Sequence, residues 1–336
     1  MDKQLRVVVA GAGGISNAWF PPLLEEGVEV VGVVDLRKET ADAQVAKYKL
    51  PAVVGSDLKE MLSQTKPDFV LDLTIPEAHG NVTCTALEAG YPVIGEKPMA
   101  ASMDEARRMV KTSEKTGKLY MVSQSRRWDV KHYQMRDTVA SGEIGQVTTL
   151  NCDFYIGAHF GGFRDDMPSP LILDMAIHHF DLARFVIGAD PVAVYAREFN
   201  PKGSWYKGDV AATCIFEMSN GIIFTYRGSW CAEGCHTSWN GDWRIIGDKG
   251  TLLCEKDQTP TGQVVAKAEG FHSELRPLNV AAPAVKHGGM HGALCEMIAY
   301  LRTGEKPQTE CHDNIKSLAM VFSAIESSKL GRRVEL

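Results

Sequence analysis

The chain has 336 residues, a formal net charge of −6 and 44% apolar residues. This length allows two domains with large cores, and no apolar stretch approaches the roughly 18–20 residues needed to cross a membrane. The negative charge offers no basic field, so neither a nucleic acid nor a membrane is expected as a partner.

The cysteines and the first residues of the chain indicate in which cellular compartment the protein is expected. Eight cysteines are scattered without a C-x-x-C pair, which is typical of reduced, buried thiols in a cytoplasmic protein. The first predicted strand begins at Leu5, which leaves no room for a signal peptide. Cys231 and Cys235 lie near His236, but at a predicted strand end and loop, so no bound metal is expected.

Residues 5–16 have the sequence LRVVVAGAGGIS and predict a nucleotide-binding turn. The valine-rich run is typical of a strand buried on both faces, and a helical stretch follows the glycines. Gly11 allows a tight turn, and Gly13 lets the backbone approach phosphate groups without an intervening Cβ. With Gly14 and Ile15, the turn would present the helix N-terminus to a pyrophosphate.

A second apolar run, residues 28–34, ends at Asp35, about 20 residues beyond the glycine turn. An acidic residue at this offset is expected to bond the ribose hydroxyls of NAD and to repel the 2′-phosphate of NADP. Arg37 and Lys38 follow directly and could neutralise that repulsion, so NADP is only the less favoured cofactor. The alternative for Asp35 is an ordinary turn residue at a strand end.

Strands and helices continue to alternate up to Ser123, which predicts a doubly wound parallel sheet of the Rossmann type in residues 1–124. Strands are expected at residues 53–54, 69–74, 92–95 and 119–123, and helices at 15–26, 57–63, 76–89 and 104–116.

Ligands of such sheets bind outside the carboxyl ends of the strands. Thr74, Pro76 and His79 follow the fourth strand, and Glu96 and Lys97 follow the fifth, so all are candidate cofactor contacts. The alternatives are helix capping for Thr74 or His79 and a surface position for Lys97. The bond between Lys97 and Pro98 is open to either isomer.

Residues 125–336 change in pattern and predict an α+β domain with a mostly antiparallel sheet. A helix is expected to end near Ala140, and closely spaced strands at residues 146–156, 192–197, 211–217, 222–230, 243–246 and 251–254. Residues 262–285 are expected to form a loop, and residues 290–301 and 313–330 to be helical.

A predicted helix at residues 171–187 interrupts the strands and carries Asp174, His178 and Asp181 at i, i+4 and i+7. A stripe of carboxylate and imidazole beside much apolar surface suggests the wall of a cleft. The alternative is an ordinary solvated helix face. The neighbouring His179 lies off this stripe and is expected to be structural.

Together these residues resemble the Gfo/Idh/MocA oxidoreductase family over nearly the whole chain. The resemblance depends on the Gly11-x-Gly13 turn, the Thr74-x-Pro76-x-x-His79 element, the Glu96-Lys97-Pro98 element and the Asp174-x-x-x-His178-x-x-Asp181 helix. It implies a Rossmann domain that binds NAD or NADP and a second domain with an open-faced sheet. That sheet would form a homodimer or homotetramer, and the C-terminal helices could pack back on the first domain.

The resemblance also implies an activity, namely NAD(P)-dependent oxidation of a secondary hydroxyl of a sugar, inositol or related polyol, or the reverse reduction. Lys97, Asp174 and His178 match the family's catalytic residues. His178 would act as the general base, Lys97 would stabilise the developing alkoxide, and Asp174 would orient one of them. Many members carry a glycine-rich run before the catalytic Asp, where this chain has Met167-Pro168-Ser169-Pro170. The resemblance implies that this loop borders the substrate, so the difference bears on the identity of the substrate rather than on the chemistry.

Arg127, Trp128, Tyr155 and His291 are candidate substrate contacts, with core packing as the alternative for each. Two other functions stay open. One is a redox-neutral glycosidase that oxidises and re-reduces tightly bound NAD. The other is a non-catalytic nucleotide-binding regulator, which the joint presence of Lys97, Asp174 and His178 disfavours.

Overall fold

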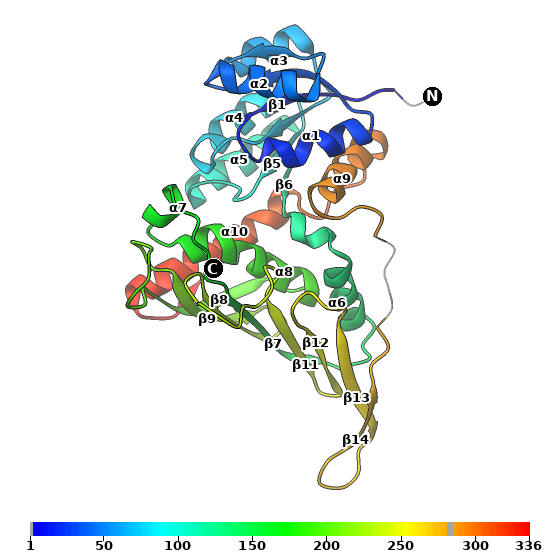
Figure 1. The fold of residues 1–336 in the computed structure, drawn as a ribbon. Helices are drawn as coiled ribbons and strands as arrows, with labels where there is room; N and C mark the ends of the chain where they lie inside the picture. The colour runs from blue at the N-terminus through cyan, green and yellow to red at the C-terminus, as the bar shows by residue number, and fades with distance from the viewer. Residues whose placement is uncertain (1–2, 281–284) are drawn as a thin grey trace. The chain divides into compact units, whose positions relative to one another are not determined.

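A computed structural model describes residues 3–280 and 285–336 of the chain (Figure 1). They form two compact units, which are described separately below. The first consists of Met1–Ser125 with Lys286–Ile315, and the second of Arg126–Val285 with Lys316–Leu336. The C-terminal residues therefore contribute to both units. None of the helices among the described residues has the length and apolar character needed to cross a membrane.

The first unit is built on a six-stranded parallel sheet of order β3-β2-β1-β4-β5-β6, which confirms the predicted doubly wound fold. Val7, Val8 and Val9 of β1 are fully buried, as expected for a central strand covered on both faces. Its elements are β1 (Arg6–Ala10), α1 (Ser16–Glu25), β2 (Glu29–Val34), α2 (Lys38–Tyr48), β3 (Val53–Gly55), α3 (Leu58–Thr65), β4 (Phe69–Asp72), α4 (Pro76–Glu88), β5 (Val93–Glu96), α5 (Met103–Thr116), β6 (Tyr120–Ser123) and α9 (Gly289–Thr303).

Helix α2 is absent from the elements expected from the sequence. Only Ala41 of this helix is buried, so its residues carry no apolar period that would mark a packed face. Helix α1 runs unbroken to Glu25 although Pro21 and Pro22 lie inside it.

The second unit is built on a nine-stranded sheet of order β14-β13-β12-β11-β7-β10-β9-β8-β15. Its described strand pairs are antiparallel except for β7 with β10, so the prediction of a mostly antiparallel sheet is confirmed. Its elements are η1 (Ser125–Trp128), α6 (Val130–Ala140), β7 (Val147–Tyr155), α7 (Phe163–Asp166), η2 (Leu171–Ala176), α8 (Ile177–Ile187), β8 (Pro191–Phe199), β9 (Ala211–Met218), β10 (Ile223–Ser229), β11 (Asp242–Gly247), β12 (Gly250–Cys254), β13 (Thr261–Lys267), β14 (Glu274–Pro277) and β15 (Val334–Glu335), and α10 (Cys311–Leu330) contributes residues to both units.

One face of this sheet is covered by α8 and the other is open. Phe180 of α8 packs edge-on against Phe216 of β9, with ring centroids 4.9 Å apart, and both side chains are fully buried. On the opposite face, Tyr195, Ile215 and Ile223 of β8, β9 and β10 are exposed. The alternation of buried and exposed residues along these strands is what made them visible in the sequence.

The expectation of a loop at residues 262–285 was wrong. This stretch contains most of β13 and all of β14, which pair with each other in antiparallel fashion. All four residues of β14 are exposed, and Val264 alone is buried in β13. A hairpin with so little burial lacks the apolar alternation by which strands are recognised. Residues 281–284 of the same stretch lie outside the described part of the chain.

A buried carboxyl lies between β8 and α10 in the second unit. Glu198 accepts a hydrogen bond from Ser169 at 3.3 Å and lines a cavity of about 780 Å³ together with Arg197 and Lys329. Burial raises the pKa of Glu198 from its ordinary 4.5 to about 7. The carboxyl is therefore protonated in the folded chain at pH values where the unfolded chain has already lost the proton.

Replacing Glu198 with Gln is expected to flatten the pH dependence of stability. In the native protein the free energy of unfolding should fall by about 3 kcal/mol as the pH rises from 4.5 to 7, because the unfolded chain releases this proton first. The Glu198→Gln variant should lose this decrease and be the more stable protein at pH 8. Urea unfolding at pH 5 and pH 8 measures the effect. An equal change in the free energy of unfolding between the two pH values in the native protein and the variant would contradict the prediction.

Candidate functional site

The glycine turn after β1 lies at the carboxyl edge of the first sheet, in contact with the end of β4. Gly11 has a φ of +94°, and a Cβ there would lie 2.6 Å from the carbonyl carbon and oxygen of Leu73. Only glycine meets both constraints. A Cβ on Gly13 or Gly14 would meet no atom within 4 Å, so the outer side of the turn is open. The turn thus has room for a phosphate group next to the start of α1.

Asp35 follows β2 at the same edge and is bonded to the glycine turn. Its Oδ2 accepts the backbone N–H of Ala12 at 2.8 Å, and its Oδ1 accepts that of Arg37 at 2.9 Å. The side chain therefore fixes the turn while remaining half-exposed. Its carboxylate can accept further bonds from ribose hydroxyls, since a carboxylate offers about four lone-pair sites.

Asp72 organises the polar residues at the end of β4 and was not predicted as a site residue. Its fully buried carboxylate accepts the hydroxyls of Thr74 at 2.6 Å and Thr83 at 3.0 Å, and it lies 3.1 Å from Nδ1 of His79. Burial by itself would lower the pKa of His79, but the Asp72 carboxylate raises it above its ordinary value. Pro76 occupies the first turn of α4, so the Thr74, Pro76 and His79 motif forms one rigid corner.

The end of β5 positions Lys97. The buried Glu96 carboxylate accepts the indole N–H of Trp19 at 2.7 Å and the backbone N–H of Lys97 at 3.2 Å. Burial raises the pKa of Glu96. The Lys97–Pro98 bond is cis, and Lys97 is half-buried. Within the first unit, the Glu96 carboxylate therefore links the backbone of Lys97 to Trp19 of α1.

Three exposed apolar side chains accompany these polar groups. Ile15 was predicted as a cofactor contact, whereas Leu36 and Ile75 were not. Ile15 follows the glycine turn, Leu36 follows Asp35, and Ile75 precedes α4, with Leu36 92% and Ile75 64% exposed. Each belongs to a loop at the carboxyl end of a strand. Exposed apolar side chains at this edge of the sheet suit the flat rings of a dinucleotide.

In the second unit, the single helix predicted at residues 171–187 consists of two elements, and the residues of its polar stripe lie in different ones. Residues Leu171–Ala176 form the π-helical turn η2, and α8 begins at Ile177. Asp174 lies in η2, where Oδ2 accepts the Arg164 Nε–H at 2.6 Å. His178 lies in the first turn of α8 and is buried. Turns of this kind occur often at functional sites.

Asp181 does not belong to a cleft wall, contrary to the sequence interpretation. It is 1% exposed and accepts Nε–H and Nη2–H of Arg127, both at 2.7 Å. The Ser317 hydroxyl donates to the same carboxylate at 2.7 Å. The sequence could not distinguish a buried ion pair from a catalytic carboxylate because both place Asp next to apolar residues.

The four predicted substrate contacts lie in different surroundings. Arg127 is bound to Asp181, and Trp128 beside it is buried. Tyr155 ends β7 and is half-buried, and His291 in the first unit is hydrogen-bonded to Glu26 at 2.8 Å. His179 is buried against Phe154 and Tyr226, and burial lowers its pKa well below the ordinary value, which fits the structural role expected for it.

The cysteines form no disulfide, and five of the eight are buried. Cys235 is exposed, Cys231 is near the Ser229 hydroxyl, and His236 accepts the backbone N–H of Gly157 at 3.3 Å. These three residues do not form a cluster of metal ligands among the described residues.

The carboxyl edge of the first sheet therefore combines an open glycine turn, an acidic residue at the ribose offset and a positioned lysine. This set fits a dinucleotide, because it offers backbone groups to phosphates, a carboxylate to hydroxyls and apolar surface to rings.

Comparisons with known proteins agree with this geometry. Residues 5–124 match the family model described as "Oxidoreductase family, NAD-binding Rossmann fold", and residues 132–253 match the GFO/IDH/MocA C-terminal domain. A 1,5-anhydro-D-fructose reductase from Ensifer adhaerens is 24% identical over 97% of each chain. A D-glucoside 3-dehydrogenase from Escherichia coli is 33% identical over 60% of each chain.

Among solved structures, an oxidoreductase from Agrobacterium radiobacter in complex with NAD⁺, L-tartaric acid and magnesium has the same fold. Its TM-score is 0.86 at 22% identity, over 99% of this chain and 98% of the other.

Proposed function

Because the chain belongs to the Gfo/Idh/MocA family of NAD-binding oxidoreductases, we propose that it oxidises a secondary hydroxyl of a sugar, inositol or related polyol, or catalyses the reverse reduction. The enzyme class is that of the related dehydrogenases and reductases. The observation that carries the proposal is the placement of Lys97 at the carboxyl end of β5, in the same sheet edge as the glycine turn and Asp35.

We propose that Lys97, Asp174 and His178 carry the reaction. Bound NAD would supply the hydride acceptor. His178 removes the hydroxyl proton, since an imidazole exchanges protons near neutral pH. The Lys97 ammonium donates a hydrogen bond to the same oxygen and stabilises its developing charge. Asp174, which accepts a hydrogen bond from Arg164, acts as a positioning residue for Lys97 or His178.

The substrate class is supported by the relatives, which act on anhydrofructose, glucosides, apiose and inositol according to their names. Tyr155 and Trp128 remain the proposed contacts to the ring of a sugar or polyol. Arg127 and His291 stay predictions, but each already has a carboxylate partner that a substrate would have to displace. The Met167-Pro168-Ser169-Pro170 loop precedes η2 and is proposed to shape the substrate choice.

We propose that the open face of the second sheet forms the interface of a homodimer or homotetramer. Tyr195 lies directly across from Ile215 on β9, and Ile223 follows on β10. Exposed apolar side chains gathered on one sheet face are typical of protein interfaces. We also propose a cytoplasmic location.

The activity is tested by nicotinamide absorbance. Purified protein is mixed with NAD, or separately with NADP, and a panel of inositols, aldoses and sugar acids. Reduction of NAD by one polyol class is the expected result and identifies the substrate. No reduction across the panel, with NAD bound to the purified protein, would favour the redox-neutral glycosidase or the regulator.

Replacing Asp35 with Ser is expected to weaken the preference for NAD over NADP. The loss of a hydrogen bond from a charged group costs about 1.5–3 kcal/mol, so kcat/KM for NAD should fall about 10–100-fold. The kcat/KM for NADP should rise relative to that for NAD, because the charge that repels the 2′-phosphate is gone. Asp42→Ser, an exposed substitution on α2, is the matched control. An unchanged NAD-to-NADP ratio in Asp35→Ser would remove Asp35 from cofactor selection.

A further inference from the structure

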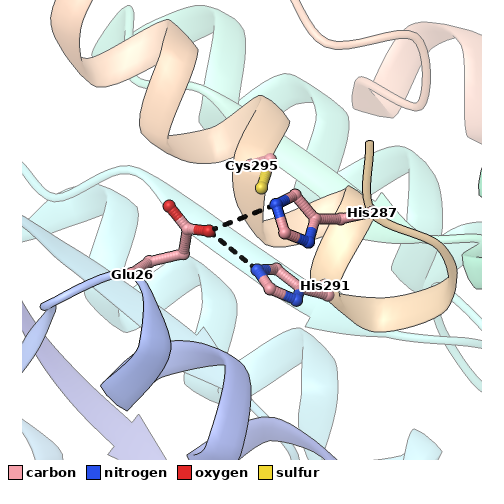
Figure 2. A group of neighbouring side chains, drawn as sticks. All are labelled: Glu26, His287, His291 and Cys295. Atoms are coloured by element: carbon pink, nitrogen blue, oxygen red, sulfur yellow. Dashed lines mark hydrogen bonds and ion pairs between the residues drawn. The ribbon is translucent and has the colours of Figure 1, made fainter. Parts of the chain in front are cut away.

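Four side chains with metal-binding atoms converge at the end of α1, within the first unit (Figure 2). Glu26 is the residue directly after α1, His287 precedes the start of α9, and His291 and Cys295 lie in α9. His291 and Cys295 are four residues apart in α9 and therefore lie on one face of that helix. Contacts between α1 and α9 bring Glu26 to them from the other end of the chain.

The distances within the group match those between the ligands of one ion. The potential ligand atoms all lie within 4.8 Å of one another. His291 Nε2 is 2.8 Å from Glu26 Oε1, and His287 Nε2 is 3.8 Å from the same oxygen. A tetrahedral ion with bonds of about 2.0–2.3 Å has its ligand atoms about 3.3–3.8 Å apart. Small side-chain rotations therefore bring all four atoms into one coordination shell.

The imidazoles of His287 and His291 stack on each other and point toward the same carboxylate, although only His291 is hydrogen-bonded to it. The rings of His287 and His291 are stacked, with centroids 3.8 Å apart and planes at 28°. Both present a nitrogen to one carboxylate oxygen, as Figure 2 shows. The Nε2 atom of His287 is buried and makes no hydrogen bond to the described residues. Its 3.8 Å separation from the Glu26 oxygen is too long for a hydrogen bond, so this buried nitrogen lacks a hydrogen-bond partner, and a metal ion would take that place.

The thiol of Cys295 completes the set. It is half-buried, and its sulfur is one of the four potential ligand atoms that lie within 4.8 Å of one another. A bound divalent metal would deprotonate it, because a coordinating thiol loses its proton outright. The sulfur atom faces the His287 imidazole in Figure 2.

We propose that Glu26, His287, His291 and Cys295 bind one zinc ion, which ties the start of α9 to the end of α1. Two imidazoles, one thiolate and one carboxylate form a donor set that suits zinc rather than magnesium or calcium. Four protein ligands leave no open position, which is typical of a structural site. His291 would then act as a metal ligand rather than as a substrate contact.

A second group of neighbouring ligand atoms, Glu310, Cys311 and His312, is a weaker candidate. Both nitrogens of His312 already have carboxylate partners, Glu310 at 2.7 Å and Glu114 at 3.0 Å. Cys311 is 1% exposed, and burial raises its pKa to about 12. This group therefore serves as an internal control.

The test uses the untagged full-length chain, stripped with a chelator and titrated with zinc against a chromophoric competitor. One zinc per chain is expected, and Cys295→Ser and His287→Ala should each weaken binding by at least about 100-fold. This magnitude follows because loss of even an outer-shell partner costs about 10–100-fold. The matched controls Cys235→Ser and His312→Ala should bind zinc like the native chain, and His312→Ala also tests the weaker group.

Cobalt substitution provides a readout that a purely structural role of these residues would not give. Cobalt in the native chain should show the thiolate charge-transfer band and the d–d bands of a tetrahedral site, and Cys295→Ser should lose the first. Substoichiometric zinc in the native chain, or native-like binding by both His287→Ala and Cys295→Ser, would overturn the proposal. Neither result bears on the dehydrogenase activity, which does not use these two residues.

Discussion

Replacing Lys97 with Ala is expected to lower kcat about 100-fold or more while leaving NAD affinity nearly intact. The lysine is proposed to stabilise charge on the reacting oxygen, which develops only in the transition state, so its loss affects turnover more than binding. The measurement is kcat with the polyol that reduces NAD, together with a calorimetric titration of NAD.

Lys111→Ala provides the matched control, because Lys111 is an exposed lysine on α5 of the same unit. It should retain native turnover. Unchanged turnover in Lys97→Ala would remove this residue from the mechanism. A large loss of NAD affinity with normal kcat at saturation would instead make Lys97 a cofactor ligand.

Replacing Asp181 with Asn is expected to destabilise the protein by about 3–5 kcal/mol. Asp181 and Arg127 form a two-point ion pair whose side chains are 2% and 5% exposed, and Asn would leave the guanidinium buried without a countercharge. Urea unfolding measures the loss. The double variant Arg127→Met with Asp181→Leu should recover part of it, because both charges are then removed together.

The control for this prediction is a pair with the same geometry in a different environment. Arg227 binds Asp153 through two hydrogen bonds of 2.7 and 2.6 Å, but the side chains are 57% and 31% exposed. Asp153→Asn should therefore cost only about 0.2–1 kcal/mol. Equal losses in Asp153→Asn and Asp181→Asn would show that burial does not set the strength of these pairs.

The parts of the fold that could be predicted are those in which burial leaves a mark on the sequence. The valine runs of β1 and β2 and the alternation in β8 and β9 follow directly from the faces they bury. Helix α2 and strand β14 bury almost nothing, so their residues show no period. The π-helical turn η2 has no compositional signal and could not be expected.

The residues of the candidate site also differ in whether the sequence could predict them. Gly11 and Asp35 belong to a motif whose spacing is local, so the sequence was sufficient to predict that they lie together at one sheet edge. Asp72 was missed because an acidic residue at a strand end looks the same whether it is solvated or bonded to two hydroxyls. Glu26 and His291 are remote in sequence, and only the packing of α1 on α9 brings them together.

The division of the chain has a consequence for its synthesis. Strand β6 lies at the edge of the first sheet, and it is bonded there by the C-terminal segment, with Val122 N–H donating to the Thr309 carbonyl at 3.0 Å. On the ribosome, this edge is made long before the segment that covers it. An unpaired strand edge is a template for aggregation. Nascent chains, and products that stop before residue 286, should therefore depend most on chaperones. In a circular permutant that begins at residue 286, the segment that bonds the edge of β6 would be synthesised before β6 itself.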